Sequence, residues 1–229
     1  FLIGALVAFA ALMLSLGIIE NRDVKRKPAT FNELLSVAAN PAFLIICLLA
    51  VLSQFVTFAT VYGFTPVAAE KIGANDFELG LLTGISTLPG IFASAMSGAL
   101  FARKFGERST IVGGFALSMI TTVCIPFIGK LWVLYLTQFL GGFGRGLVFP
   151  LLMGLSIKNV EDSKRATAMG FFQAIYSIGM FLGPVLVGQL NQMVGLEWGF
   201  WCTGAVAFAG MLIMLLYRQK DRPASKSSE

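Results

Sequence analysis

Long apolar runs separated by short polar segments make up most of the chain. A helix needs about 20 apolar residues to cross about 30 Å of hydrocarbon. Runs of that length are Phe1–Ile19, Phe43–Phe64, Leu79–Phe101, Thr110–Ile128, Leu131–Ile157, Ala166–Leu190 and Trp198–Tyr217. They do not alternate apolar and polar residues, and they are too long for the strands of a membrane barrel. The pattern predicts seven transmembrane helices and an all-α fold.

Composition supports this interpretation and excludes several kinds of site. Hydrophobic residues make up 56% of the 229 positions and charged residues only 13%, whereas a soluble domain has about a quarter charged residues. There is no histidine, and Cys47, Cys124 and Cys202 lie far apart, so we expect no metal site. A nucleotide-binding loop ending in Gly-Lys-Ser/Thr is absent from the sequence. We therefore expect neither an enzyme nor a bound cofactor.

Basic residues fall almost entirely on one side of the predicted membrane. One side holds only Lys71 and Lys130. The other side holds fourteen: Arg22, Lys25, Arg26, Lys27, Arg103, Lys104, Arg108, Lys158, Lys164, Arg165, Arg218, Lys220, Arg222 and Lys226. Because cytoplasmic loops are rich in Lys and Arg, we expect a multi-pass protein of the cell membrane with a cytoplasmic C-terminus. The net charge of +5 lies between apolar runs and forms no basic face, so it does not predict nucleic-acid binding.

The spacing of the runs divides the chain into four parts. Residues 1–19 form a lone helix, residues 20–42 a cytoplasmic loop, residues 43–217 six helices, and residues 218–229 a polar tail predicted to be disordered. A capping-box pattern at Thr30 to Glu33 predicts a short helix over Phe31–Ala39, either along the membrane surface or as a simple spacer. The six helices divide as three plus three, the arrangement of inverted repeats in secondary transporters. The start at Phe1, not Met, suggests a piece of a longer or processed protein.

Arg145 is the sharpest candidate for a functional residue. It lies 13 residues from both Trp132 and Lys158, about 20 Å of helix from either surface, which is too far for its side chain to reach water. A central arginine costs about 2.5–3.5 kcal/mol on insertion scales. Nearby glycines leave room for another backbone or a ligand: Gly141, Gly142, Gly144 and Gly146. The residue either contacts an anion, from a substrate or a partner carboxylate, or is a structural arginine satisfied by carbonyls and Gln side chains.

Other polar groups inside the runs are candidates for lining a substrate cavity. They are Gln54, Thr57, Gln138, Gln173 and Tyr176, with a stripe of small residues at Thr83, Ser86, Thr87, Gly90 and Ser94. At helical spacing Gln54, Thr57 and Val61 share a face from which Tyr62 is displaced. Such groups also join membrane helices, at about 0.6 kcal/mol each. All twelve carboxylates lie in loops, helix ends or the tail, so we expect any proton coupling to reside outside this chain.

A glycine–proline pattern marks the sixth run, at Gly170, Gly179, Gly183-Pro184 and Gly188. It resembles the proline–glycine motif of the major facilitator superfamily, known from the fifth helix of its proton-driven efflux members. In this chain it would stand in the eleventh helix, and it lacks the family's Gly-Gly pair after the proline. The resemblance implies a conformational hinge at Gly179, Gly183 and Pro184. The alternative is a tightly packed, kinked helix with no part in substrate choice.

The loop after the third run adds to this resemblance. Residues 98–108, Gly-Ala-Leu-Phe-Ala-Arg-Lys-Phe-Gly-Glu-Arg, look like the family's cytoplasmic G-x-x-x-D-R-x-G-R-R loop. Aligned on Gly106, Lys104 and Arg108 fall on basic positions, whereas Arg103 stands where the family has a carboxylate. We therefore interpret this cluster as a topology anchor. Residues 71–82 also look like the turn before the family's eighth helix.

Together these motifs resemble helices six to twelve and the central cytoplasmic loop of the family. The resemblance implies a six-helix C-terminal half built from two inverted repeats. Its partners would be the lipid bilayer, a missing N-terminal six-helix half and a small organic solute moved by alternating access. The Gly183-Pro184 region favours efflux. The alternatives are a seven-helix receptor or sensor, disfavoured because the seventh run has no lysine for retinal, and a scaffold subunit.

Overall fold

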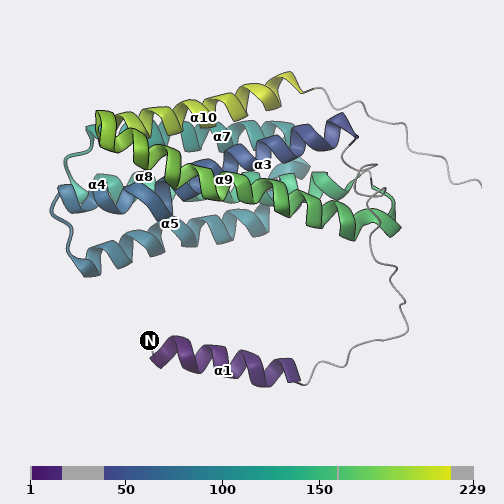
Figure 1. Cartoon of the computed structure of the whole chain (residues 1–229), viewed down its shortest axis with the longest axis horizontal. Helices are drawn as coiled ribbons and strands as arrows, with labels where there is room; N and C mark the ends of the chain where they lie inside the picture. Colours follow the sequence, from purple (N-terminus) through teal and green to yellow (C-terminus); the bar gives the residue numbers. More distant parts are fainter. Residues whose placement is uncertain (1, 17–38, 159, 218–229) are drawn as a thin grey trace, which may run out of the picture. The chain divides into compact units, whose positions relative to one another are not determined.

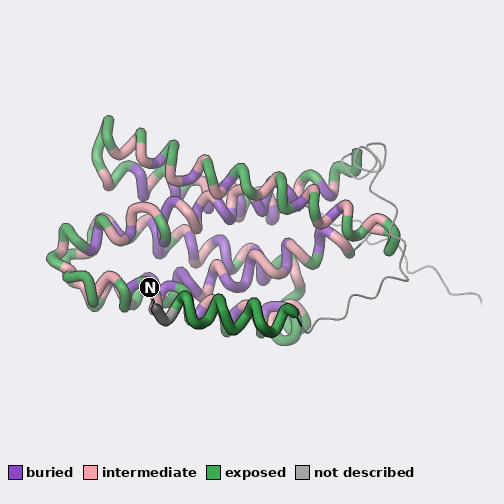
Figure 2. The backbone as a smooth tube through the Cα atoms, turned by 60° about the horizontal axis from the view of Figure 1, so that its bottom comes forward, coloured by how far each residue is buried: buried purple, intermediate pink, exposed green. Residues whose placement is uncertain are grey.

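The computed structural model describes residues 2–16, 39–158 and 160–217. The predicted surface helix over Phe31–Ala39, apart from Ala39, and the tail at 218–229 lie outside the described residues. The chain divides into two units, residues 1–30 and 31–229. In the first unit, helix α1 (Leu2–Leu16) has 15 residues, and from Gly4 onward they are exposed (Figure 2). The full span at residues 1–19 therefore stays a prediction.

The described part of the second unit contains six helical segments long and apolar enough to cross a membrane. The first contains α3 (Pro41–Ala59), the π-helical turn η1 (Thr60–Phe64) and α4 (Thr65–Lys71). The second contains α5 (Asp76–Met96), the π-helical turn η2 (Ser97–Ala102) and α6 (Arg103–Phe105). The third contains α7 (Glu107–Cys124) and the 3₁₀ turn η3 (Ile125–Phe127). The others are α8 (Leu131–Lys158), α9 (Arg165–Val194), preceded by the 3₁₀ turn η4 (Asp162–Lys164), and α10 (Leu196–Leu216). These segments confirm the all-α class and six of the predicted spans.

Local sequence signals set several of the helix boundaries. The Asn40 side chain accepts a hydrogen bond from the backbone N–H of Ala42 at 3.0 Å and caps α3. Asn75 and Glu78 form a complete capping box at the start of α5, with bonds of 3.0 and 2.8 Å. Gly106 and Gly195 have φ of +84° and +101°, a region open to glycine at no steric cost. They allow the abrupt reversals before α7 and α10.

The helices of the second unit pack in a symmetric pattern (Figure 1). The most extensive contacts join α3 with α9, α5 with α8, and α7 with α10. The first three helices are α3, α5 and α7, and their counterparts among the last three are α8, α9 and α10. Replacing each helix by its counterpart turns the α3–α9 pair into the α8–α5 pair and leaves the α7–α10 pair unchanged. This is the pattern expected of two three-helix repeats related by a two-fold axis, as the sequence predicts.

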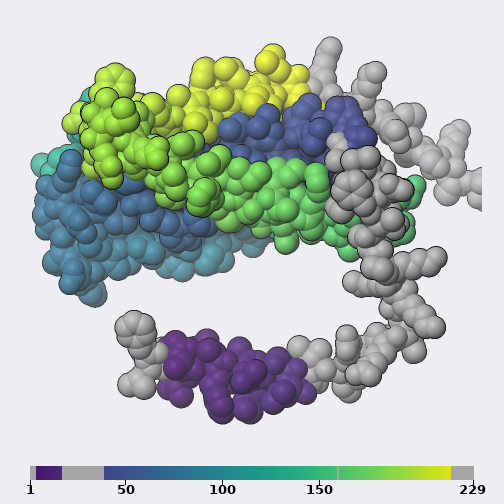
Figure 3. All heavy atoms as spheres, in the orientation of Figure 1, coloured from purple at the N-terminus to yellow at the C-terminus, as the bar shows by residue number. Residues whose placement is uncertain are grey.

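Burial distinguishes the central helices from the outer ones (Figure 2). About half of the apolar stretch of α3 and of α8 is buried, against 22% for α5 and for α9. The outward faces are apolar, with Phe92 and Phe181 exposed to 67% and 68%. The largest cluster of buried side chains lies among α3, α7, α8, α9 and α10 and includes Leu49, Phe115, Leu152 and Phe172. In the space-filling view, α3, α9 and α10 pack against one another on one face of the unit (Figure 3).

Candidate functional site

Arg145 lies in an open pocket between helices of both repeats. The pocket has a volume of about 210 Å³. Its lining residues come from α3 and η1, from α5 and from α8: Thr57, Val61, Tyr62, Ser86, Thr87, Gly90, Ile91, Ser94, Gly142, Arg145 and Gly146. Four of the five residues in the predicted polar stripe of α5 line it, and Thr83 does not. The structure thus brings Thr57, the α5 stripe and Arg145 together.

The guanidinium of Arg145 makes no hydrogen bond or salt bridge to the described residues. Among the described residues, no hydrogen-bond acceptor reaches its buried Nη2 atom. Its Nη1 atom lies 3.0 Å from the point where a β-carbon would stand on Gly141, so the glycine makes room for the side chain. A buried charged donor without an acceptor is costly. The geometry therefore leaves a donor of Arg145 open to an acceptor from outside the described residues.

The other glycines around Arg145 admit neighbouring backbones. A β-carbon on Gly142 would collide with the carbonyl oxygen of Ser86, and one on Gly146 would lie 2.7 Å from the Cα of Gly90. On the opposite side, a β-carbon on Gly144 would approach the carbonyl oxygen of Gly114 in α7 at 3.0 Å. Small residues permit this close approach of membrane helices. The run is therefore mainly a packing surface for α5 and α7.

The hydroxyl groups on the pocket walls are available as hydrogen-bond acceptors. Ser86, Thr87 and Thr57 each donate to a carbonyl one turn earlier in their own helix, at 2.7, 2.8 and 2.9 Å. Ser94 Oγ donates across the helix pair to the carbonyl of Gly146 at 3.1 Å. Because these protons are already used, the hydroxyls present oxygen lone pairs to the pocket. Arg145 is the charged donor among the lining residues.

Tyr62 reaches the pocket because the backbone changes its winding. The sequence displaces Tyr62 from the face of Thr57 and Val61 in an ideal α-helix, and in the structure Tyr62 nevertheless lines the same pocket as both. In the π-helical turn η1, the N–H of Thr65 bonds to the carbonyl of Thr60, five residues earlier. Residues five apart then stand nearly above one another. The Tyr62 ring lies 5.0 Å from that of Phe58, is 60% exposed and lines the pocket with Thr57.

The remaining predicted cavity residues lie elsewhere in the second unit. Gln54 is buried in α3. Gln138 is buried in α8, and its Oε1 atom has no hydrogen-bond partner among the residues that the structure describes. Gln173 is exposed on α9. Tyr176 makes edge-to-face contacts with Phe149 and Phe172, at ring distances of 5.1 and 5.3 Å. None of these four residues lines the Arg145 pocket.

The glycines of the predicted hinge lie at the contact between α9 and α3. A β-carbon on Gly179 would collide with the carbonyl oxygen of Val51, and one on Gly183 would lie 2.7 Å from that of Phe55. Both glycines are buried, and α9 continues as one helix through Pro184 to Val194. These contacts explain the glycines by packing, and a hinge role stays a prediction.

The basic loop has contacts that the sequence did not predict. Arg108 donates from Nε to the carbonyl of Met214 at 3.2 Å and from Nη2 to that of Leu215, which satisfies free carbonyls at the end of α10. Glu107 forms a 2.8 Å salt bridge with Lys158 at the end of α8. Lys104 Nζ lies 5.3 Å from the centroid of the Phe105 ring, whereas Arg103 is exposed. Arg108 is a basic residue near the start of α7, and a basic side chain there can reach the free carbonyls at the end of another helix. This is the sequence signal that could have revealed the Arg108 contact.

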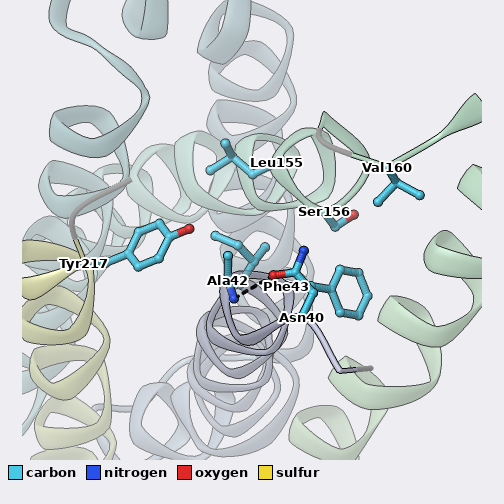
Figure 4. A pocket seen from close by; sticks show the side chains of 8 residues that line it. Asn40, Ala42, Phe43, Leu155, Ser156, Val160 and Tyr217 are labelled. Atoms are coloured by element: carbon cyan, nitrogen blue, oxygen red, sulfur yellow. Dashed lines mark hydrogen bonds between the residues drawn. The ribbon is translucent and has the colours of Figure 1, made fainter. Parts of the chain in front are cut away.

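A second, smaller pocket lies at this same end of the unit (Figure 4). Its volume of about 30 Å³ suits one water molecule. Phe43 and Leu155 form its apolar wall, and Asn40, Ser156 and Tyr217 bring polar atoms to it.

The fold and the pocket define a polytopic membrane protein of helical inverted repeats with a polar, arginine-containing pocket between the repeats. Residues 46–229 match the family model of the Major Facilitator Superfamily, and the chain belongs to this family. This membership confirms the resemblance seen in the motifs and favours the carrier over the seven-helix receptor.

Two curated relatives and one solved structure illustrate the similarity. The class H tetracycline resistance protein of Pasteurella multocida is 25% identical over 64% of this chain and 37% of its own length. The quinolone resistance protein NorA of Staphylococcus aureus is 27% identical over 75% of this chain and 44% of its own. The chain therefore spans less than half the length of these relatives. A crystal structure of the peptide transporter POT (E310Q mutant) with sulfate has a TM-score of 0.64 at 19% identity, over 81% of this chain and 41% of that one. That likeness shows the fold.

Proposed function

We propose that the chain is the C-terminal part of a secondary-active carrier that exports a small organic solute across the cell membrane by alternating access. The observation that carries this proposal is the 210 Å³ pocket between helices of both repeats, in which the buried Nη2 atom of Arg145 has no hydrogen-bond partner among the described residues. Two relatives named for resistance to tetracycline and to quinolones support export rather than uptake. The missing N-terminal half would close the pocket on its open side.

Arg145 would contact an anionic group in this carrier. A guanidinium presents a rigid fork of donors that suits a carboxylate or phosphate. The accepting hydroxyls of Thr57, Ser86 and Thr87 would bind donor groups of the same solute. The Tyr62 ring would cover its apolar part, and the Tyr62 hydroxyl would hydrogen-bond to it. The anion is either a carboxylate of the solute or a carboxylate of the missing half. Gln54, Gln138, Gln173 and Tyr176 lie outside this pocket and would not contact the solute bound there.

The conformational change would use the glycine contact between α3 and α9. Gly179 and Gly183 allow the two backbones to touch, and Pro184 removes one hydrogen bond from α9. Relative motion of these helices would alter the pocket from one side of the membrane. The basic loop at Arg103, Lys104, Gly106 and Arg108 would lie on the cytoplasmic side with the C-terminus.

Replacing Arg145 by Ala in the complete carrier tests the proposal. We expect active efflux of a fluorescent, carboxylate-bearing drug from loaded cells to fall at least tenfold, because the charged contact is lost (about 1.4 kcal/mol or more). Arg145→Lys should restore part of the activity, since it keeps the charge without the fork. Arg103→Ala, an exposed arginine outside the pocket, is the matched control. Unchanged efflux kinetics with normal membrane insertion would remove Arg145 from the transport site.

A reporter fusion tests the orientation separately. A fluorescent protein that matures only in the cytoplasm, fused after Glu229, should be bright, and a periplasmic phosphatase fused there should be inactive. The opposite pattern would reverse the assigned sides of the membrane and leave the Arg145 test unaffected.

A further inference from the structure

A third pocket lies at the end of the second unit where α4 ends and α10 begins. Its volume is about 110 Å³, room for three or four water-sized groups. The floor is apolar and includes Ile72, Ile125 and Phe200. Two side chains of opposite charge, Lys71 and Glu197, also line it. The pocket therefore combines an apolar base with one positive and one negative group.

The two charges are available to a ligand. Lys71 is the last residue of α4, and Glu197 lies in the first turn of α10; both are exposed. Within the described part of the chain, they form no salt bridge with each other or with another residue. A lysine at the C-terminus of a helix and a glutamate in the first turn of another each interact favourably with the helix dipole, by about 0.3–1 kcal/mol. That effect does not explain why both line one pocket.

Tryptophans indicate the depth of this pocket in the membrane. All three tryptophans of the chain lie near the beginnings of α8 and α10, at the same end of the unit: Trp132, Trp198 and Trp201. Trp132 and Trp198 are 64% and 52% exposed. The Trp201 ring lies 5.2 Å from that of Trp198 and 6.2 Å from that of Phe127. Because tryptophan concentrates at the level of lipid headgroups, Lys71 and Glu197 lie at that level too.

We propose that this pocket binds a phospholipid with a phosphoethanolamine headgroup. The lipid phosphate pairs with Lys71, and the primary ammonium donates hydrogen bonds to the Glu197 carboxylate. The glycerol end and the first acyl carbons cover Ile72 and Phe200. A choline headgroup has no N–H to donate to Glu197, and a headgroup with only negative charge would be repelled by it. The charge pattern therefore selects a zwitterion whose amine carries protons.

Competition between lipids on the full chain tests this site without any mutation. The protein is purified in detergent and offered equal amounts of phosphatidylethanolamine, its mono- and dimethyl derivatives, and phosphatidylcholine, all with identical acyl chains. Native mass spectrometry measures the lipid retained. We expect retention to fall stepwise with each added methyl group, by about tenfold over the series. Equal retention of all four lipids would overturn the proposal.

Charge-neutral variants identify the two contacts. Glu197→Gln should abolish the preference for ethanolamine over choline, and Lys71→Gln should lower retention of both lipids severalfold. The controls Glu70→Gln and Lys130→Gln remove exposed charges from the same end that do not line the pocket. They should retain the preference. Glu197→Gln retaining the same preference as Glu70→Gln would refute the assigned carboxylate contact.

Discussion

The two symmetry-related helix pairs, α3 with α9 and α5 with α8, solve the same packing problem with the same device. In each pair, two glycines four residues apart let the backbone of the neighbouring helix approach: Gly179 and Gly183 in α9, Gly142 and Gly146 in α8. In lipid, where apolar burial does not drive helices together, close backbone packing supplies the attraction. This feature is common to both pairs and is structural.

The side chains beside the two contacts differ in kind. The α5–α8 contact is bordered by Arg145 and by the hydroxyls of Ser86 and Ser94. Aromatic rings accompany the α3–α9 contact instead, where the ring of Phe43 in α3 lies 5.9 Å from that of Phe171 in α9. The comparison teaches that helix packing and solute chemistry are separate features of this fold. The polar pocket is an addition made at one of two equivalent contacts.

Alanine at the contact glycines should have the largest effect. We expect Gly142→Ala, Gly146→Ala, Gly179→Ala and Gly183→Ala each to destabilise the fold by about 3 kcal/mol or more, because the new methyl group meets a backbone that no rotamer change can move. Unfolding in a mixed-detergent titration, followed by tryptophan fluorescence, measures the loss. A tolerated alanine in one pair only would show that the two contacts are not equivalent.

Each helix offers its own control for that series. Gly154 in α8 and Gly170 in α9 have no atom within 4 Å of a built β-carbon. Alanine there should stabilise the helix by roughly 0.5–1 kcal/mol through its propensity. Destabilisation at these positions would mean that any alanine harms the helices, and the effect of the contact glycines would lose its explanation.

Tyr62, which lines the Arg145 pocket, and Tyr176, in the aromatic cluster beside α9, should differ in their effect on efflux. Tyr62→Phe should lower efflux about fivefold, the equivalent of about 1 kcal/mol from one lost hydroxyl contact. Tyr176→Phe keeps its ring contacts and should change efflux less than about twofold. Equal losses in the two variants would extend the solute site from the Arg145 pocket to the aromatic cluster beside α9.

Ser94 should contribute a smaller amount to the α5–α8 contact. Ser94→Ala removes the 3.1 Å bond to the carbonyl of Gly146 and should cost about 0.5–1.5 kcal/mol of unfolding free energy. The control is Ser177→Ala, in which the lost hydroxyl donates only to Ala174 of its own helix, at 2.7 Å. If both variants unfold alike, the bond across the helices adds nothing to the pair.

The salt bridge between Glu107 and Lys158 should have the smallest effect, since it lies outside both glycine contacts. Its side chains are 32% and 50% exposed, so Lys158→Met should cost less than about 1 kcal/mol, and less still at high salt. The comparison is Lys164→Met, which breaks an ion pair within one turn, to Glu161. A loss from Lys158→Met that persists in 1 M salt would point to a packing role for the lysine stem.

Much of the fold and one important part of the site could be predicted from the chain. Hydropathy located the six long helices that the structure contains. The position of Arg145, far from both surfaces in a polar setting, was also predictable. The stripe from Ser86 to Ser94 was visible as a pattern, but nothing in it indicated that it faces α8. The glutamines were weaker candidates, because an amide inside a helix has the same sequence signature whether it lines a cavity or lies in the core.

The sequence by itself determined which segments belong in lipid and which residue types they carry, because hydropathy and charge are properties of local stretches that add along the chain. Only the tertiary structure decided which side chains meet. It placed Arg145 opposite α5, turned Tyr62 into the pocket through a π-helical turn, and set Arg108 against the end of α10. These contacts depend on distances between segments far apart in sequence and on the local winding of the backbone. Neither these distances nor the winding of the backbone can be read from the pattern of apolar residues.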